Sequence, residues 1–393
     1  MPERTAPSDS APSEVAPSEV AASEVAPSEV NPSDSAPAAP AESAALAESA
    51  AHESAWVSAH VFYQGDLDPL ITGVVAPLVA ELDAAGLARE FFFLRYWDGG
   101  PHLRLRVLPA TDGAADAADA SGVTDRRTGG VRAEVERLVA ERFGDHLARY
   151  PSAGHPDPEE YARMARSLAE REHLTSYSER PHPPNSVSFI PYRREHDRYG
   201  HGPAIEAVER HFAESSRIAL RVVTLGVPAD RRATAAGALI LLTWFIGEPD
   251  PGRLASWTGD LGPGGRASWT GGRRRAPDGD DARRDKVTGL ARRMRALAAV
   301  QDPPPGGTLA DWARSARTLR DTLTALAAEG AFVPPSRGWE GRGGIATPGG
   351  GVPTVLDICA HLICNRFGLS IVTEAALRRL AAEAVAVLAE EGG

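Results

Sequence analysis

Three polar residues, His102, Arg104 and Arg106, alternate with apolar residues along one short segment of the chain. They lie in residues 91–109 (FFFLRYWDGGPHLRLRVLP), where two apolar, β-prone runs flank a DGGP segment typical of a tight β-hairpin. Residues of equal parity share one face of a strand, so the three polar side chains form a row about 13 Å long. Neighbouring guanidinium groups in such a row lie about 6.6 Å apart and repel each other.

This repulsion is relieved if an anion binds over the row or if carboxylates face it from a neighbouring strand. Arginine also suits bidentate recognition of a carboxylate better than lysine does. The ordinary alternative is that the row is a solvated outer face of the sheet.

A second group of charged residues lies in residues 192–200 (YRREHDRYG), which include Glu195 and Arg198. The segment leaves a predicted strand, residues 186–192, and enters a helix that begins near Pro203. Side chains at the end of a strand often converge on a ligand. The same cluster could equally be a surface network of ion pairs.

The third group lies in a predicted helix, Thr354–Phe367, which is otherwise mostly apolar. Asp357, His361 and Asn365 are spaced at i, i+4 and i+8 and therefore share one stripe of the helix. A polar stripe on a buried helix must be hydrogen-bonded or face a cavity. Either His361 is a core histidine satisfied by Asp357, or Asp357 orients the imidazole while its other nitrogen faces a pocket.

The elements that must position these groups predict an α+β fold. Over residues 56–200 the order is strand, helix, strand, strand, helix, strand, which matches a ferredoxin-like split βαβ order. This order predicts one antiparallel sheet with helices on one face, followed by a mostly helical C-terminal half. The helices expected there are Pro203–Ser215, Arg217–Leu225, Ala229–Ile246, Lys286–Val300, Leu309–Glu329, Thr354–Phe367 and Thr373–Glu390.

The chain divides into a tail and one domain. Residues 1–55 repeat a Pro/Ser/Glu/Ala pentapeptide and have too few apolar residues to fold, so they predict a disordered tail. The domain, residues 56–393, has a sheet part (56–200) and a helical part (201–393). Within the helical part, residues 247–285 are rich in Gly, Pro, Asp and Arg, and predict a flexible insertion.

The composition narrows the class of protein. With 42% hydrophobic and 24% charged residues, the chain resembles an ordinary soluble globular protein. Its net charge is −11, but residues 1–55 hold −9 of this and the remainder only −2. Without a large basic surface, no nucleic-acid binding by bulk electrostatics is expected. Lys286 is the only lysine, so Schiff-base chemistry and a P-loop lysine have essentially no candidate.

The cysteines and the apolar runs of the sequence indicate in which cellular compartment the protein is expected. Cys359 and Cys364 are the only cysteines and lack the spacing of a thiolate zinc site, so we expect reduced thiols. The first residues, MPERTAPSDS, lack the apolar segment of a signal peptide. The longest apolar run, Ala236–Ile246, is far shorter than the ~20 residues that a membrane span needs. We therefore expect a soluble, cytoplasmic protein.

Taken together, the three segments resemble the signature motifs of one family. Residues 91–107 resemble its "fFiRY.D...HlRLR" motif, residues 192–215 its "Y..E..RYGG...iE.aE..F..dS" motif, and residues 361–366 its "H..cNR" motif. These motifs are typical of the C-terminal, glutamate-elimination domain of lantibiotic dehydratases, which also exists as a stand-alone thiopeptide-type bacteriocin biosynthesis protein. One departure is His201, where the family usually has a second glycine.

The resemblance implies a defined reaction. A separate glutamylation protein uses glutamyl-tRNA to esterify Ser or Thr of a ribosomally made precursor peptide. The elimination protein, a lyase, then removes the Cα proton and expels glutamate, which leaves dehydroalanine or dehydrobutyrine. The implied partners are the precursor peptide and the glutamylation protein, without direct contact to nucleic acid. No cofactor and no metal are implied.

The resemblance also implies roles for individual residues. Its catalytic positions fall on Arg104, Arg106, Glu195, Arg198 and His361. Positions implied to bind substrate are His102, Asn365 and Arg366. Arginines suit the carboxylates of the glutamyl group, and an acid such as Glu195 suits its amine. An imidazole such as that of His361 can transfer a proton near neutral pH, although the sequence leaves open whether it takes or delivers one.

Two other functions are compatible with the sequence. Some stand-alone relatives are pyridine synthases, which join two dehydroalanines in a formal cycloaddition and expel a leader peptide. They tend to lack the Arg/Glu/His set, so its presence here favours elimination. The protein could instead be a non-catalytic subunit that docks the precursor peptide, in which case the charged motifs would be structural.

Overall fold

The computed structural model describes residues 55–110, 124–154, 157–172, 177–258, 280–333 and 351–392. All of the predicted tail before Ala55 lies outside these residues. So do residues 259–279, which form the middle of the predicted insertion.

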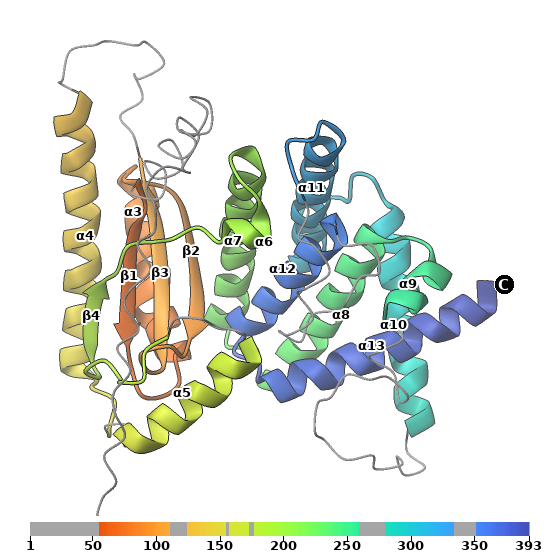
Figure 1. Cartoon of the computed structure of the whole chain (residues 1–393), viewed down its shortest axis with the longest axis horizontal. Coiled ribbons are helices and arrows are strands. Elements are labelled where there is room, and N and C mark those ends of the chain that lie inside the picture. Colours follow the sequence, from red (N-terminus) through yellow and green to blue (C-terminus); the bar gives the residue numbers. More distant parts are fainter. Residues whose placement is uncertain are drawn as a thin grey trace, which may run out of the picture. The chain divides into compact units, whose positions relative to one another are not determined.

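A four-stranded antiparallel sheet forms the first part of the domain (Figure 1). Its strands are β1 (Val57–Phe62), β2 (Ala88–Tyr96), β3 (His102–Pro109) and β4 (Ser186–Phe189). Their order is β2-β3-β1-β4, with every neighbouring pair antiparallel. The predicted hairpin is confirmed, and its DGGP turn places Gly99 and Gly100 at φ values of 81° and 108°, which glycine adopts readily. Membership of the ferredoxin-like class stays a prediction.

The apolar face of the sheet packs against helices. Leu103, Leu105 and Val107 of β3 are at most 1% exposed, as the alternation along this strand predicts. The helical elements on this side are α2 (Asp68–Leu70), the π-helix η1 (Ile71–Val75), α3 (Ala76–Ala84) and α4 (Thr124–Arg149). The helix expected before the hairpin therefore exists, and α4 is a helix between the third and fourth strands, as the predicted order has it.

Helix α5 (Pro158–Glu172) was not predicted from the sequence. Over residues 158–170 of this helix, only Tyr161, Ala165 and Ala169 are buried, at a spacing of four residues. Such a narrow stripe, with two small alanines, gives a weak periodic signal. The helix braces the hairpin, because the Tyr161 hydroxyl accepts a hydrogen bond of 2.6 Å from the Gly99 N–H.

The remainder of the described chain is mostly helical. Its helices are α6 (His196–Tyr199), α7 (Pro203–Thr224), α8 (Ala229–Gly247), α9 (Pro251–Thr258), α10 (Asp280–Ala299), α11 (Thr308–Ala328), α12 (Val352–Arg366) and α13 (Ile371–Gly392). An α+β fold with an antiparallel sheet and a mostly helical remainder is therefore confirmed. Among the described residues, no helix combines the length and apolar character that crossing a membrane requires.

One detail of the helical prediction was wrong. Helix α7 is continuous where two helices were expected, because Ser215 and Ser216 are buried inside it rather than ending it. The Ser215 hydroxyl donates to the carbonyl of Phe212 within the same helix. Helix α9 lies within the segment 247–285, whose flexibility as an insertion stays a prediction.

The helical part attaches to the edge strand β2, which lies beside α7 and α12 (Figure 1). The Asn365 amide accepts a hydrogen bond from the Arg95 N–H at 3.0 Å and donates one to the Arg95 carbonyl at 2.8 Å. The Ser216 hydroxyl accepts from the Phe93 N–H, and Arg366 donates through Nε to the Phe93 carbonyl at 3.0 Å. Side chains of the helices thus satisfy backbone groups that an edge strand leaves free.

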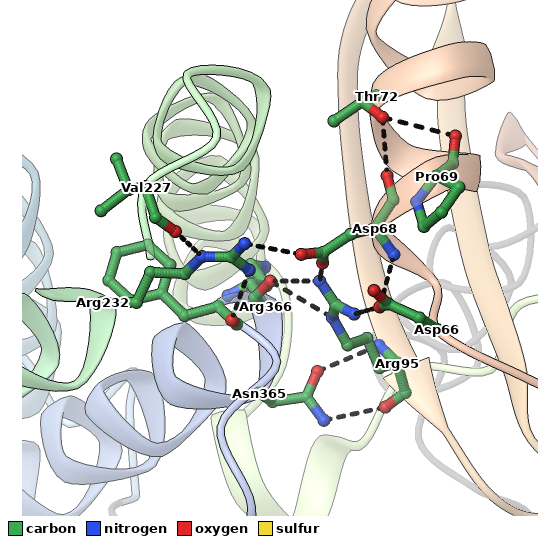
Figure 2. A network of polar contacts seen from close by, with 10 residues as sticks. Asp66, Asp68, Pro69, Thr72, Arg95, Val227, Arg232, Asn365 and Arg366 are labelled. Carbon is green, nitrogen blue, oxygen red and sulfur yellow. Dashed lines mark hydrogen bonds and ion pairs between the residues drawn. The ribbon is translucent and has the colours of Figure 1, made fainter. Parts of the chain in front are cut away.

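A network of polar contacts strengthens this junction (Figure 2). Asp68 accepts from Arg95 at 2.5 Å and pairs with Arg232 of α8 at 2.6 Å. Arg95 also donates to the carbonyl of Arg366, and Arg232 to that of Phe367, at the C-terminal end of α12. Because cations are favourable at a helix C-terminus, the network fixes this end of α12 against the sheet.

Candidate active site

The predicted row on β3 forms the centre of the candidate site. Strand pairing places Ser58, His60 and Phe62 of β1 and Phe92, Leu94 and Tyr96 of β2 across from it. On neither paired strand does a carboxylate therefore lie directly opposite one of the arginines. Arg106 is 7% exposed and His102 is fully buried, so the row is not a solvated surface. Of the interpretations left open by the sequence, an anion-binding face fits best.

We call the side chains of Ser58, His60, His102, Arg104 and Arg106 the arginine face. Arg106 is its most deeply buried cation. Its guanidinium carbon lies 4.4 Å from the ring centre of Tyr192 and 5.3 Å from that of Phe92. Its Nε has no hydrogen-bond partner among the described residues. Burial lowers the pKa of Arg106, against the opposing effect of Tyr192 and Glu195 nearby.

Arg104 is held by its neighbours on the same face. Its guanidinium carbon lies 3.5 Å from the ring centre of Tyr96, and its Nε donates a 3.1 Å hydrogen bond to Nε2 of His102. Burial, followed by repulsion from Arg106, lowers the pKa of Arg104 to about 10, so the group stays charged at neutral pH.

His102 offers no free nitrogen to a substrate. Its Nδ1 lies 2.8 Å from the carbonyl of Gly100, and its Nε2 is taken by Arg104. Both ring nitrogens thus contact the protein itself, and the implied substrate-binding role of His102 stays a prediction.

His60 is a member of this face that the sequence reasoning missed. It lies opposite Arg104 and stacks on His102, with ring centres 4.9 Å apart and planes 18° apart. Burial, followed by the charge of Arg104, lowers the pKa of His60 to about 2. The alternation Ser58-His60 in the first strand was the available signal, since equal parity on β1 and β3 places both polar sets on one face.

Glu195 and Arg198 form an ion pair with each other next to the arginine face. Their side chains are 50% and 14% exposed, respectively. The charge of Glu195 acts on Arg104 and Arg106 and partly opposes the lowering of the pKa of both groups by burial. The cluster therefore interacts electrostatically with the arginine face.

A buried ion pair next to this cluster was also missed. Arg194 and Glu209 of α7 make two hydrogen bonds of 2.8 and 2.6 Å and are almost fully buried. Burial and the charge of Glu209 raise the pKa of Tyr192 well above its ordinary value. This pair therefore supports the ring on which Arg106 rests.

His361 has a different partner from the one considered in the sequence. Its Nδ1 lies 2.8 Å from Glu374 of α13, and its side chain is 43% exposed. Asp357 instead pairs with Arg378 at 2.6 Å and accepts a hydrogen bond from Trp244. The expectation that Asp357 orients the imidazole was wrong, because Asp357 faces these buried groups.

Glu374 is charged at neutral pH. Its burial raises its pKa, but Arg378 and His361 outweigh this effect and hold the pKa below its ordinary value. Arg378 also donates a 2.8 Å hydrogen bond to Glu374. The Glu374 carboxylate, itself hydrogen-bonded by Arg378, therefore binds Nδ1 of His361.

The position of His361 follows from α12. Asn365 contacts β2 at Arg95, and His361 precedes it by one turn on the same stripe, about 6 Å along the helix axis. In the described part of the chain, no hydrogen bond or ion pair links His361 to Arg104 or Arg106. The contact between α12 and β2 shown here is made by Asn365, while the described partner of His361 is Glu374 of α13.

Asn365 and Arg366, the two other residues implied to bind substrate, contact other parts of the protein. Both ends of the Asn365 amide bind the backbone of Arg95. Arg366 is fully buried, and its Nη1 and Nη2 atoms have no hydrogen-bond partner among the described residues. Burial lowers the pKa of Arg366 to about 10.

The described residues contain no group of three or more His, Cys, Asp or Glu side chains that could hold a metal ion. Cys359 and Cys364 are buried free thiols, and burial raises the pKa of Cys359 to about 12. Neither thiol is therefore a ready nucleophile or metal ligand.

Comparison with known proteins places this site in a family. Residues 56–385 match the family described as lantibiotic biosynthesis dehydratase C-term. The chain belongs to this family. No curated protein matches the sequence significantly.

Comparison with solved structures finds several similar chains. One is the pyridine synthase TbtD from thiomuracin biosynthesis, at 21% identity and a TM-score of 0.59, with 86% of this chain and 99% of that chain covered. The tRNA-dependent lantibiotic dehydratase MibB from Microbispora sp. 107891 has 19% identity and a TM-score of 0.48, with 86% and 28% covered. TsrL has 18% identity and a TM-score of 0.45, with 86% and 95% covered.

Proposed function

We propose that the protein is a lyase that eliminates glutamate from glutamylated Ser or Thr of a ribosomally made precursor peptide. The product is a peptide with dehydroalanine or dehydrobutyrine, as in lanthipeptide or thiopeptide biosynthesis. The observation that carries this proposal is the arginine face, where Arg104 and Arg106 lie together without a facing carboxylate on either paired strand. Family membership supports the same class of chemistry.

The substrate supplies the anions that this face lacks. When glutamate is esterified through its α-carboxyl group, the γ-carboxylate stays free, and elimination creates a second carboxylate on the leaving group. Guanidinium groups bind carboxylates in a bidentate manner and stabilise charge that develops as the ester bond breaks. Glu195, half exposed at the edge of the face, is suited to the amine of the glutamyl group.

His361 is the group that we propose to take the proton. Because the carboxylate of Glu374 can only accept, it fixes the hydrogen of the neutral ring on Nδ1 and leaves the lone pair on Nε2. Nε2 takes the Cα proton, the electron pair of the Cα–H bond forms the C=C bond, and the Cβ–O bond breaks. Glutamate leaves with the electrons of that bond, and no cofactor takes part in these steps.

A pyridine synthase is the second candidate, because TbtD shares the fold over almost its whole length. In that function the substrate would already be dehydrated, and the arginine face would have no glutamate to bind. A non-catalytic docking subunit is the third candidate. Both alternatives differ from elimination in what happens to a glutamylated peptide.

The test is co-expression of the precursor peptide, the glutamylation protein and variants of this chain. We expect His361→Ala and Arg198→Ala to stop elimination but not glutamylation, so that the glutamyl ester accumulates in mass spectra. Arg137→Ala is the control, since Arg137 also pairs with a glutamate three residues away, but at an exposed position of α4. Full dehydration by the His361 variant would argue against the assignment.

A further inference from the structure

His102 lies behind Arg104 in an arrangement that fixes its tautomer. The carbonyl of Gly100 can only accept a hydrogen bond, so the 2.8 Å contact requires a hydrogen on Nδ1 of His102. The 3.1 Å contact from Arg104 Nε then meets the lone pair on Nε2. Both contacts are satisfied only by the neutral ring with its hydrogen on Nδ1.

The ring is held in place by its neighbours. It is fully buried and stacks on His60 on one side. The ring of Phe62 lies 4.7 Å away, and the ring of Tyr96 meets it edge to face at 5.8 Å. Such packing in a strand between two others leaves the imidazole little freedom to turn.

The charge of the ring is fixed as well. Burial lowers the pKa of His102 to about 3, with the nearby charges of Arg104 and His182 acting in the same direction and the Gly100 carbonyl opposing them. The ring therefore stays neutral in any ordinary buffer and keeps its acceptor. A protonated ring would have no lone pair for Arg104 and would repel it.

The consequence concerns the guanidinium of Arg104. The Nε of Arg104 is bound to His102, and its guanidinium group lies over the ring of Tyr96. The two Nη groups are therefore the hydrogen-bond donors of the guanidinium that remain for an anion. An arginine side chain loses much conformational freedom when it binds a ligand, and a neighbour that fixes it beforehand lowers this cost.

We propose that His102 is a positioning residue, which aims the Nη groups of Arg104 at the carboxylate of the substrate. This inference rests on the proposed function for the identity of that carboxylate. It assigns His102 to the support of the site and removes it from the residues that touch substrate. The turn residue Gly100 belongs to the same support, since its carbonyl fixes the ring.

Three substitutions of His102 distinguish the effect of its hydrogen-bond acceptor from the effect of its ring packing. Glutamine is long enough to place its oxygen near the position of Nε2, where it can accept from Arg104. Asparagine reaches only the position of Nδ1 and therefore only Gly100. Phenylalanine keeps the stacking on His60 but has no acceptor.

The assay is single-turnover elimination from a glutamylated precursor peptide, with thermal unfolding of each variant as the control for folding. We expect His102→Phe and His102→Asn to lose about 100-fold in kcat/KM, mainly through KM, since small displacements of a substrate-binding group have effects of this size. His102→Gln should recover most of the loss. A phenylalanine variant as active as wild type, or a glutamine variant no better than the asparagine variant at equal stability, would overturn the inference.

A second measurement does not depend on activity. Nitrogen NMR of the histidine rings should show His102 protonated on Nδ1 alone and unchanged between pH 5 and 8. A ring protonated on Nε2, or one that titrates in this range, would overturn the inference. If the wild-type protein does not eliminate glutamate, the proposed function fails, while the NMR result still decides the role of His102.

Discussion

Replacing Arg106 with methionine should make the protein more stable and inactive at the same time. Arg106 is a buried cation whose Nε has no hydrogen-bond partner in the described chain. Methionine has a similar length, fits apolar surroundings and carries no charge. The substitution therefore removes an unfavourable buried group together with its function, a trade-off common at binding sites.

The magnitude follows from the contacts of Arg106. Replacing buried charged groups with apolar residues of similar volume often stabilises a protein by about 1–4 kcal/mol. Against this, the contacts of the guanidinium with Tyr192 and Phe92 are lost, which costs about 1–2 kcal/mol. We expect a net increase of about 1 kcal/mol in the free energy of unfolding. Elimination should fall at least about 100-fold, as when one donor to a developing charge is removed.

Urea unfolding and elimination of glutamate measure the two effects. Arg194→Met is the matched control, since Arg194 is equally buried but paired with Glu209. That variant leaves a carboxylate buried without its cation and should lose about 3–5 kcal/mol. If Arg106→Met destabilises the protein as much as Arg194→Met does, Arg106 has a permanent counter-ion and the anion-binding interpretation is wrong.

Two further predictions concern other contacts. Glu374→Gln should lower elimination at least about 100-fold, because an amide stabilises the protonated His361 ring poorly; an unchanged rate of glutamate release would exclude this role. Asp68→Asn should lower stability at pH 7 by about 1–3 kcal/mol, since Asp68 joins Arg95 to Arg232. Burial raises the pKa of Asp68, but the two arginines outweigh this effect and hold it below its ordinary value. Its contribution is therefore present above about pH 4 and lost as pH falls further, so urea unfolding should show a smaller difference from wild type at pH 3.

Local patterns predicted the parts of the site that lie within one element. The alternation in β3 and the glycines of its turn placed Arg104 and Arg106 on one face, as the structure has them. The stripe of α12 was also correct, since Asp357, His361 and Asn365 all make polar contacts. Periodicity within a strand or helix decides which side chains share a face.

Partners from distant segments could not be predicted in the same way. Asp357 was the natural choice for His361, because it lies one turn away, but Glu374 from the following helix takes that place. His60 joined the arginine face only through the register between β1 and β3. Arg194 looked like one charge among several until α7 brought Glu209 against it. Pairing across elements depends on packing, which a single sequence does not encode locally.

The most direct test of the central claim is mass spectrometry of a glutamylated precursor peptide incubated with the purified protein alone. Elimination predicts that each modified residue loses glutamic acid and becomes dehydroalanine or dehydrobutyrine, with free glutamate released. A glutamylated peptide that stays unchanged, while a dehydrated peptide is cyclised with release of its leader, would contradict the account.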